Sequence, residues 1–191
     1  MEELGRIVNF IFEAGTARNI PRSHRQFLRN ADDSVASHSF GVAVIGLILA
    51  ELEKADQDKV FKMCFFHDFP EIRTNDPNFV NSFYRVDKEE KATLDQWAGI
   101  PGGAKILNLL TEYNERKTKE AIVAKDADIL GQIFLQREYL PEASYDLERW
   151  HNHQAKKLKT DSARQIADLV LKTSPLKWLY DFSDSKKDKR R

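Results

Sequence analysis

The sequence has few features of a secreted, membrane-spanning or nucleic-acid-binding protein. Cys64 is the one cysteine in 191 residues, which excludes an internal disulfide and a thiolate metal site. The 30 basic and 30 acidic side chains cancel, so a broad surface for a nucleic-acid polymer or a membrane is not expected. The longest apolar run, Phe40–Ala50, is much shorter than the roughly 20 residues of a membrane span. Because no charged and apolar leader opens the chain, we expect a soluble protein of the reducing cytoplasm.

Residues that interrupt helices are also scarce. The chain has eight glycines and six prolines, and no alternation of Val, Ile and Thr around hairpin turns is present. Apolar residues instead recur with a 3.6-residue period, which predicts an all-α fold. A chain of this length suits one domain that buries roughly 70% of its unfolded surface. We expect this domain to cover residues 1–180, and the charged segment 181–191 to be a disordered tail.

The apolar pattern divides the chain into helices and two polar connections. In a first helix that fades near Gly15, one face is shared by Leu4, Ile7, Val8, Ile11 and Phe12. Further helices are expected at residues 38–52, after a cap at Asp33-Ser34, and at 60–66, 87–97, 104–113, 118–134, 143–158 and 161–171. Residues 16–37 are expected to form a basic loop that returns over the core, and residues 77–86 a polar stretch that could act as a lid.

Three separated groups of histidine and acid residues stand out against this pattern. His38 opens an apolar helix, the pair His67-Asp68 lies where Pro70 should stop a buried helix, and Asp128 lies among inward-facing apolar residues. Each alone would be an ordinary core or capping residue. Together they form a nitrogen and oxygen set that suits one divalent ion (Mn, Co, Fe, Mg or Zn) and leaves positions open for water and substrate.

Asp126 and Asp128 compete for the last ligand position, because residues two apart on a helix point about 200° apart. Asp128 is preferred because it lies on or beside the apolar face, whereas Asp126 falls nearer Lys119 and the polar side. Periodicity alone does not decide between them. His151 and His153 have the alternate spacing of a solvated face and are not expected to be ligands.

Glu71 follows His67 by four residues and would lie on the same side of a regular helix. It could reach a water at the ion and act as a base without binding the ion. The alternative is a surface acid near a helix end. Arg18, Arg22 and Arg25 of the basic loop are ordinary solvated cations when each is taken alone, although a guanidinium is the natural partner of a phosphate.

These residues resemble the signature of the HD-domain metal-dependent phosphohydrolases, which is a histidine, then a His-Asp pair, then a distant aspartate. The match consists of His38, His67-Asp68 and Asp128. More narrowly, the chain resembles the compact branch that contains the 5'-deoxynucleotidases. The strings that occur in the order of that branch, within about residues 5–140, are PRSHRQFL, SVASHSFGVAVIGLILA, HDFPEIRTND, DKEEKATLDQW and TKEAIVAKDADIL.

The resemblance implies an HD-domain helical bundle, hydrolase activity and one divalent metal ion between core helices. The ligands of this ion would be His38, His67, Asp68 and Asp128. Glu71 matches the family's catalytic acid, and Asp76 matches its following substrate-side aspartate. Arg22 is the nearest match to a phosphate-contacting arginine, with Arg18 and Arg25 as the alternatives.

The chain departs from the family pattern at three places. Ser37 stands where a glutamate commonly precedes the first histidine, Asn75 replaces a common glycine, and Phe69-Pro70 is unusual after the His-Asp pair. We expect these changes to affect ligand orientation and substrate choice more than metal binding.

The predicted function is hydrolysis of the 5'-phosphomonoester of nucleoside or deoxynucleoside monophosphates by a water activated at the metal. A phosphodiesterase of cyclic or linear dinucleotides and a non-catalytic metal or nucleotide sensor would keep the same site, whereas a helical interaction protein would bind no metal. A homodimer is expected mainly from the resemblance. Exposed apolar positions that could form its contact are Trp97, Ile100, Trp150 and Trp178. The metal, the base and the sugar stay open.

Overall fold

The computed structural model describes residues 2–28, 31–86, 88–141 and 144–187. Within these ranges the chain is helical, and the one element of β type is an isolated bridge between Pro21 and Ser34. The helices are α1 (Glu2–Gly15), α2 (Val35–Glu53), α3 (Gln57–Phe66), α4 (Glu71–Thr74), α5 (Phe79–Tyr84), α6 (Glu89–Trp97), α7 (Gly103–Glu115), α8 (Lys119–Tyr139), α9 (Tyr145–Ala155), α10 (Asp161–Lys172) and α11 (Lys177–Lys187). Two short 3-10 helices, η1 (Thr16–Asn19) and η2 (Ser23–Gln26), follow α1. The predicted all-α fold is confirmed.

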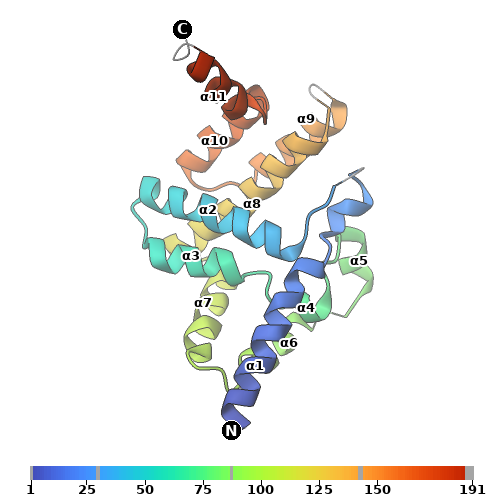
Figure 1. The fold of residues 1–191 in the computed structure, drawn as a ribbon, viewed down its shortest axis with the longest axis vertical. Helices are drawn as coiled ribbons and strands as arrows, with labels where there is room; N and C mark the ends of the chain where they lie inside the picture. The colour runs from blue at the N-terminus through green and yellow to red at the C-terminus, as the bar shows by residue number, and fades with distance from the viewer. Residues whose placement is uncertain (1, 29–30, 87, 142–143, 188–191) are drawn as a thin grey trace.

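The core lies where α2, α3 and α8 meet. Helix α2 packs on α3 and α8, and α7 and α10 contact α8 as well. The largest fully buried apolar side chains of this core are Leu49, Met63, Leu130, Ile133, Leu158, Val42, Val60 and Val123. In Figure 1, α2 crosses the middle of the molecule, α1 runs toward the lower end, and α9, α10 and α11 lie at the upper end. Segments far apart in the sequence therefore meet at the centre of the molecule.

The helix boundaries near the predicted site follow local sequence signals. Ser34 is the N-cap of α2, and it exchanges hydrogen bonds with Ser37, so that each hydroxyl accepts from the other residue's backbone amide. Ser37, which departs from the family pattern, is thus a capping residue. Thr118 caps α8 through its hydroxyl, as predicted. Helix α3 ends at Phe66, and Pro70 stands at the N-cap of the short α4, in agreement with the stop expected from proline.

Helix α2 combines a long apolar sequence with a central position in the core. Its 19 residues have a mean hydropathy of 1.8 in the most apolar window, so by length and composition it could cross a membrane. This apolar character extends beyond the uninterrupted run Phe40–Ala50. A core helix of a globular protein passes the same test, and 44% of the window is buried inside the protein. Its contacts with α3 and α8 identify it as a core helix.

The N-terminal helix turns Phe10 inward and much of its predicted apolar face outward. Phe10 packs on Phe69 and Trp97, with ring centroids 5.4 Å and 4.9 Å away. Trp97 is 6% exposed, so the prediction that it is a surface residue was wrong. Of the apolar face predicted for this helix, the members between 50% and 74% exposed are Leu4, Val8, Ile11 and Phe12. Phe69, unusual in the family pattern, is part of this aromatic cluster.

Two segments are more regular than the sequence suggested. The expected lid segment contains helix α5, whose side chains Phe79, Phe83 and Tyr84 are at least 77% exposed. Residues 181–187 of the expected disordered tail continue helix α11, whereas residues 188–191 lie outside the described ranges. The expected starts of two helices, at residues 87 and 143, also lie outside these ranges.

Candidate metal centre

The three groups of histidine and acid residues converge from three elements. His38 lies in the first turn of α2, His67 and Asp68 directly follow α3, and Asp128 lies on α8. His38, His67 and Asp128 each offer one ligand atom, and these atoms lie within 4.8 Å of one another. Asp68 completes the group, because its carboxylate oxygens lie 3.5 Å from His38 Nε2 and 3.2 Å from His67 Nε2. These four residues, the predicted ligands, are called the metal centre below.

His67 has the orientation of a metal ligand. Its Nδ1 lies 2.7 Å from the carbonyl oxygen of Cys64 and donates to it, which directs Nε2 toward the metal centre. The Nε2 atom is buried without a hydrogen-bond partner and lies 3.2 Å from Asp68 Oδ1 and 3.6 Å from Asp128 Oδ1. A buried, unpartnered ring nitrogen that faces two carboxylates is the arrangement that a divalent cation satisfies. The residues present therefore fit a metal ion.

The protonation states also suit metal binding. Burial and the Arg22 guanidinium lower the pKa of His38, which keeps this imidazole neutral. Burial would raise the pKa of Asp68, but His67 and Arg22 hold it well below its usual range. Burial also opposes ionisation of His67, yet Asp68 and Asp128 raise the pKa of this histidine to about 10. In the metal-free protein the His67 imidazolium thus supplies the positive charge that an ion would bring.

Asp128 is held by residues that the sequence interpretation did not identify. Lys125 Nζ donates to Asp128 Oδ2 at 2.6 Å, and the Tyr113 hydroxyl donates to the same oxygen at 3.3 Å. Burial would raise the pKa of Asp128, but Lys125 and His38 hold it well below its usual value. Lys125 stands three residues before Asp128 on one helix, and this spacing was a usable signal. Tyr113 comes from α7, so nothing in the local sequence pointed to it.

Gly131 allows the close approach of the two helices that carry His38 and Asp128. A Cβ atom at Gly131 would lie 2.9 Å from Val42 Cγ2 and 3.4 Å from His38 Cε1. The first distance is shorter than a normal carbon contact, so a larger residue would push α2 and α8 apart. Gly131 therefore helps to set the distance between two of the ligands.

Arg22 joins the metal centre to two further carboxylates. It is 7% exposed, and its Nη1 donates to Asp68 Oδ2 at 2.5 Å and to Glu71 Oε2 at 2.9 Å. Its Nε lies 3.2 Å from Asp76 Oδ2, an oxygen that also accepts from the backbone amide of Ser23 at 2.7 Å. The structure thus brings Arg22, Glu71 and Asp76 into one buried cluster beside the predicted ligands.

The other two candidate arginines lie elsewhere. Arg18 is an exposed residue of η1 and does not line the pocket described below. Arg25 forms an ion pair with Asp32, with an N to O distance of 3.3 Å. Of the three candidate arginines, Arg22 is the one that lies beside the metal centre.

Glu71 is not the surface acid of the alternative interpretation, because it is 9% exposed. Burial, together with the neighbouring Asp68 carboxylate, raises the pKa of Glu71 well above its usual range. Asn75, four residues later, has a positive φ of 59°. With its ψ of 160° this is a conformation that glycine adopts most readily, which accounts for the glycine that the family commonly has here and makes asparagine a strained residue at this position.

Asp126 and His151 correct two predictions of solvent exposure. Asp126 is 1% exposed and accepts hydrogen bonds from the amides of Lys159 and Thr160 and from the Thr160 hydroxyl, at 2.7 to 3.0 Å. It fixes the junction between α9 and α10 instead of facing the polar side of α8. His151 is 3% exposed, whereas His153 is exposed as predicted. A helix that is covered on both sides buries residues that a one-sided pattern assigns to solvent.

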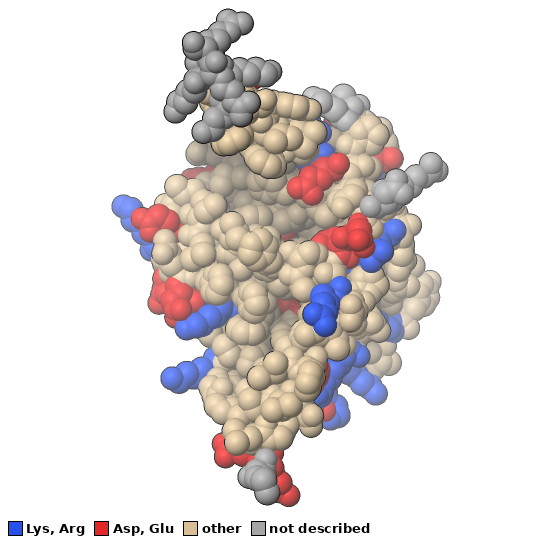
Figure 2. Space-filling model, in the orientation of Figure 1, with Lys and Arg blue, Asp and Glu red and all other residues tan. Residues whose placement is uncertain are grey.

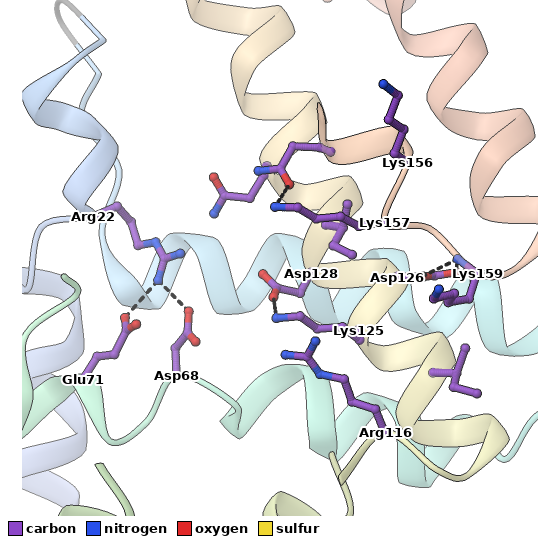
Figure 3. A pocket seen from close by; sticks show the side chains of 14 residues that line it. Arg22, Asp68, Glu71, Arg116, Lys125, Asp126, Asp128, Lys156, Lys157 and Lys159 are labelled. Atoms are coloured by element: carbon purple, nitrogen blue, oxygen red, sulfur yellow. Dashed lines mark hydrogen bonds and ion pairs between the residues drawn. The ribbon is translucent and has the colours of Figure 1, made fainter. Parts of the chain in front are cut away.

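A pocket of about 980 Å³ opens beside the metal centre. One side is lined by Arg22, Asp68, Glu71 and Asp128. Facing these residues across the pocket, Figure 3 shows cationic side chains from the end of α7, from α8 and from the junction of α9 with α10. These cations are Arg116, Lys125, Lys156, Lys157 and Lys159. Partial burial, and to a smaller extent the nearby Lys125, lower the pKa of Lys157.

The chain is similar to proteins of known family. The pattern of the HD domain matches residues 14–170. A protein from Dictyostelium discoideum named 5'-deoxynucleotidase HDDC2 is 30% identical over 122 residues, which cover 56% of this chain and 63% of that protein. A Xenopus laevis protein of the same name is 25% identical over 174 residues, covering 86% of this chain and 85% of that protein. The aligned region thus spans less than two thirds of the Dictyostelium relative.

Among solved structures, a conserved hypothetical protein from Pyrococcus furiosus superposes with a TM-score of 0.72 at 30% identity. The superposition covers 87% of this chain and 99% of that one. The matched family pattern spans most of the sequence and contains all four residues of the metal centre. The chain belongs to the HD domain family.

Proposed function

We propose that this protein hydrolyses the 5'-phosphomonoester of nucleotides, with one divalent ion held by the metal centre. The observation that carries the proposal is the buried His67 Nε2, which has no hydrogen-bond partner and faces Asp68 and Asp128 next to the buried Glu71. A structural zinc site is closed, because its four protein ligands leave no position for water or substrate. This site instead lies on an open pocket, with an acid and an arginine beside it. The names of the two relatives support the nucleotide substrate.

A bound divalent ion would lower the pKa of an attacking water and offset charge on a phosphate oxygen. Glu71 is placed to accept a proton from that water in its ionised form, because Arg22 contacts its carboxyl group at 2.9 Å and a bound divalent ion would lower the pKa that burial raises. Arg22 and Lys125 bring positive charge to the two sides of the centre and would stabilise the charge on the phosphate in the transition state. Asp76 positions Arg22 through its contact with Nε.

A smaller pocket of about 260 Å³ adjoins the main one and supports a nucleoside as the remainder of the substrate. The two pockets share Arg22, Gln132 and Gln154. The smaller one is also lined by the aromatic side chains of Phe27, Phe79 and Trp150. Aromatic faces stack on any nucleobase, and amide side chains can pair with its edge. A base in this pocket would leave the 5'-phosphate to reach the metal centre.

The test is release of inorganic phosphate from a panel of ribonucleoside and deoxynucleoside 5'-monophosphates. The protein is assayed after loading with Mn, Co, Fe, Mg or Zn, since the structure fits several of these ions. Turnover of at least one monophosphate, abolished by a chelator and restored by one metal, is the expected result. Stabilisation by nucleotides with no product under any metal would overturn the proposal in favour of a sensor.

We also propose a homodimer through the exposed side of α2. Its apolar side chains Phe40, Val44, Ile48 and Leu52 are 41% to 68% exposed and recur every four residues. No charged residue occurs from Val35 to Ala50, and Figure 2 shows a mainly uncharged face over this part of the molecule. In a two-fold symmetric dimer the same patch of each chain contacts the other, and a patch without charge avoids repulsion between like charges. Light scattering should give twice the chain mass and, for Ile48→Glu, a single chain mass; a monomeric wild-type protein would remove the proposal.

A further inference from the structure

The main pocket contains more positive charge than the proposed reaction requires. Beyond Arg22 and Lys125, which contact carboxylates of the metal centre and Glu71, its lining includes four further cations. These four, called the basic wall, are Arg116, Lys156, Lys157 and Lys159. Figure 3 shows that they reach the pocket from the end of α7 and from the junction of α9 with α10, opposite Arg22 and Glu71.

The cations of the basic wall have no carboxylate partner among the residues that the structure describes. Within these ranges no carboxylate forms an ion pair with any of them, and Lys157 Nζ donates to the side-chain amide oxygen of Gln154 at 3.0 Å. Ordinary surface lysines are also often unpaired. These four differ because they gather on one wall of the cavity that contains the metal centre, where the further acid of the lining, Asp126, is 1% exposed and accepts from the Lys159 and Thr160 amides and the Thr160 hydroxyl.

The charge balance of the pocket points to a ligand with several negative charges. Arg22, Lys125 and a divalent ion together offset the charges of Asp68, Asp128, Glu71 and Asp76. A phosphate monoester adds only about two negative charges at neutral pH. Asp126, the remaining acid of the pocket lining, offsets one of the four cations of the basic wall, and the three positive charges that remain exceed the charge of one phosphate.

We propose that the basic wall binds a second phosphate group of the substrate, so that the preferred substrate is a nucleotide with one phosphate in addition to the one hydrolysed. This inference rests on the proposed function and narrows its substrate class. The second phosphate is carried either on another ribose oxygen, as in a nucleoside 3',5'-bisphosphate, or in a 5'-diphosphate. Water would add to the phosphorus atom of the phosphate beside the metal centre, and the bond between this phosphorus and the leaving oxygen would break. The leaving oxygen takes up a proton, and the second phosphate stays on the nucleoside product.

The first experiment compares matched substrates with the same metal-loaded protein. Phosphate release is measured for the 5'-monophosphate, the 3',5'-bisphosphate and the 5'-diphosphate of each nucleoside, and the products are separated by anion-exchange chromatography. We expect kcat/KM to be at least about tenfold higher for one of the doubly phosphorylated forms than for the monophosphate, as charge-assisted contacts of this kind give. The form that is preferred identifies where the second phosphate is attached.

The second experiment removes charge from the basic wall. Lys157→Gln combined with Lys159→Gln should raise KM for the preferred substrate about tenfold and change KM for the monophosphate less than about twofold. Lys172→Gln, an exposed lysine of α10 that does not line the pocket, is the matched control and should change neither. The melting temperature of each variant shows that the fold is retained.

The outcomes separate this inference from the proposed function. Equal kcat/KM for mono- and doubly phosphorylated nucleotides, or an equal effect of the double substitution on both, overturns the second-phosphate site and leaves the nucleotidase proposal intact. If no nucleotide is hydrolysed, the proposed function fails, and calorimetric binding of the bisphosphate and the monophosphate to the metal-loaded protein then decides the inference. Equal dissociation constants would reject it, and tighter binding of the bisphosphate that Lys157→Gln weakens would support it.

Discussion

On one side of the main pocket the charged side chains are buried and paired, and on the other they are exposed and, within the described part of the chain, have no carboxylate partners. The side chains of His38 and His67 are 4% and 2% exposed, and those of Asp68 and Asp128 are 15% and 14% exposed. Lys156, Lys157 and Lys159 are exposed. Burying a charge is unfavourable unless it is paired, so the metal centre has a fixed geometry in the folded protein, whereas the basic wall can adapt to the ligand that neutralises it.

The comparison predicts different consequences for substitutions on the two sides. On the buried side a single change should abolish function because the geometry is shared by several groups. On the exposed side a single change should alter affinity and leave the reaction itself intact. The predictions below test this difference from the largest expected effect to the smallest.

The largest effect is expected for His67→Ala. It removes the free Nε2 ligand, so metal content and turnover should be lost together. The loss of kcat should exceed the roughly 10⁴-fold upper range for removal of a general base. Elemental analysis of the purified variant and a phosphate-release assay check both quantities. A variant that kept one metal per chain would show that the ion is held by other residues.

Glu71→Gln should separate chemistry from metal binding. The amide keeps the shape of the side chain but cannot accept a proton, so kcat should fall about 10²- to 10⁴-fold while the metal content stays unchanged. The matched control is Glu138→Gln, the same change at an exposed acid of α8. Unchanged turnover in Glu71→Gln would remove its assigned role.

The pair Asp126→Asn and Asp128→Asn should give opposite results although the residues stand two apart on one helix. Asp126 accepts from three donors at the start of α10, so its substitution should lower the free energy of unfolding by about 1 to 3 kcal/mol and leave metal binding intact. Asp128→Asn should lose the metal. Urea unfolding and metal titration of both variants are the measurements. Loss of metal in Asp126→Asn alone would reverse the assignment of the ligand.

The smallest effect is expected from pH in the metal-free protein. The pKa of His67 is raised from its usual value of 6.5 to about 10. The contribution of this residue to the free energy of unfolding is therefore fully present below pH 6.5 and is lost as the pH rises through 10. The raised pKa of Glu71 acts in the same direction, because ionisation of this buried acid destabilises the folded state. The melting temperature of chelator-treated protein should therefore fall between pH 6.5 and 10. A flatter curve is expected for His67→Gln, and a rise over this range would contradict the assignment.

The sequence was sufficient to predict the helical fold and the residues that meet at the site. His38 and Asp128 are polar residues on apolar helical faces, and such positions are informative because burial of an unpaired polar group is unfavourable. The boundaries of α2 and α8 followed from Ser34 and Thr118, whose caps are local signals. The predicted ligands, Glu71 and Arg22 were thus identified before their positions in space were known.

Other features depend on contacts between distant segments and could not be predicted. Asp126 was assigned to the solvent side because the pattern of α8 does not reveal that α10 begins against it. Trp97 is buried by Phe10, which precedes it by 87 residues. Lys156 and Lys159 form an ordinary charged stretch in the sequence, and only the fold places them opposite Arg22.

The position of Asp126 ties α9 and α10 to the helix that carries a predicted ligand, although these two helices supply no predicted ligand themselves. One turn of α8 carries both Asp126, which accepts from the junction at Lys159, and Asp128. A proteolytic cut or an inserted residue at this junction would therefore lower the stability of the fold around α8 while leaving the predicted ligands in place. The junction offers a place at which the stability of the folded site can be changed by engineering without replacing any predicted ligand.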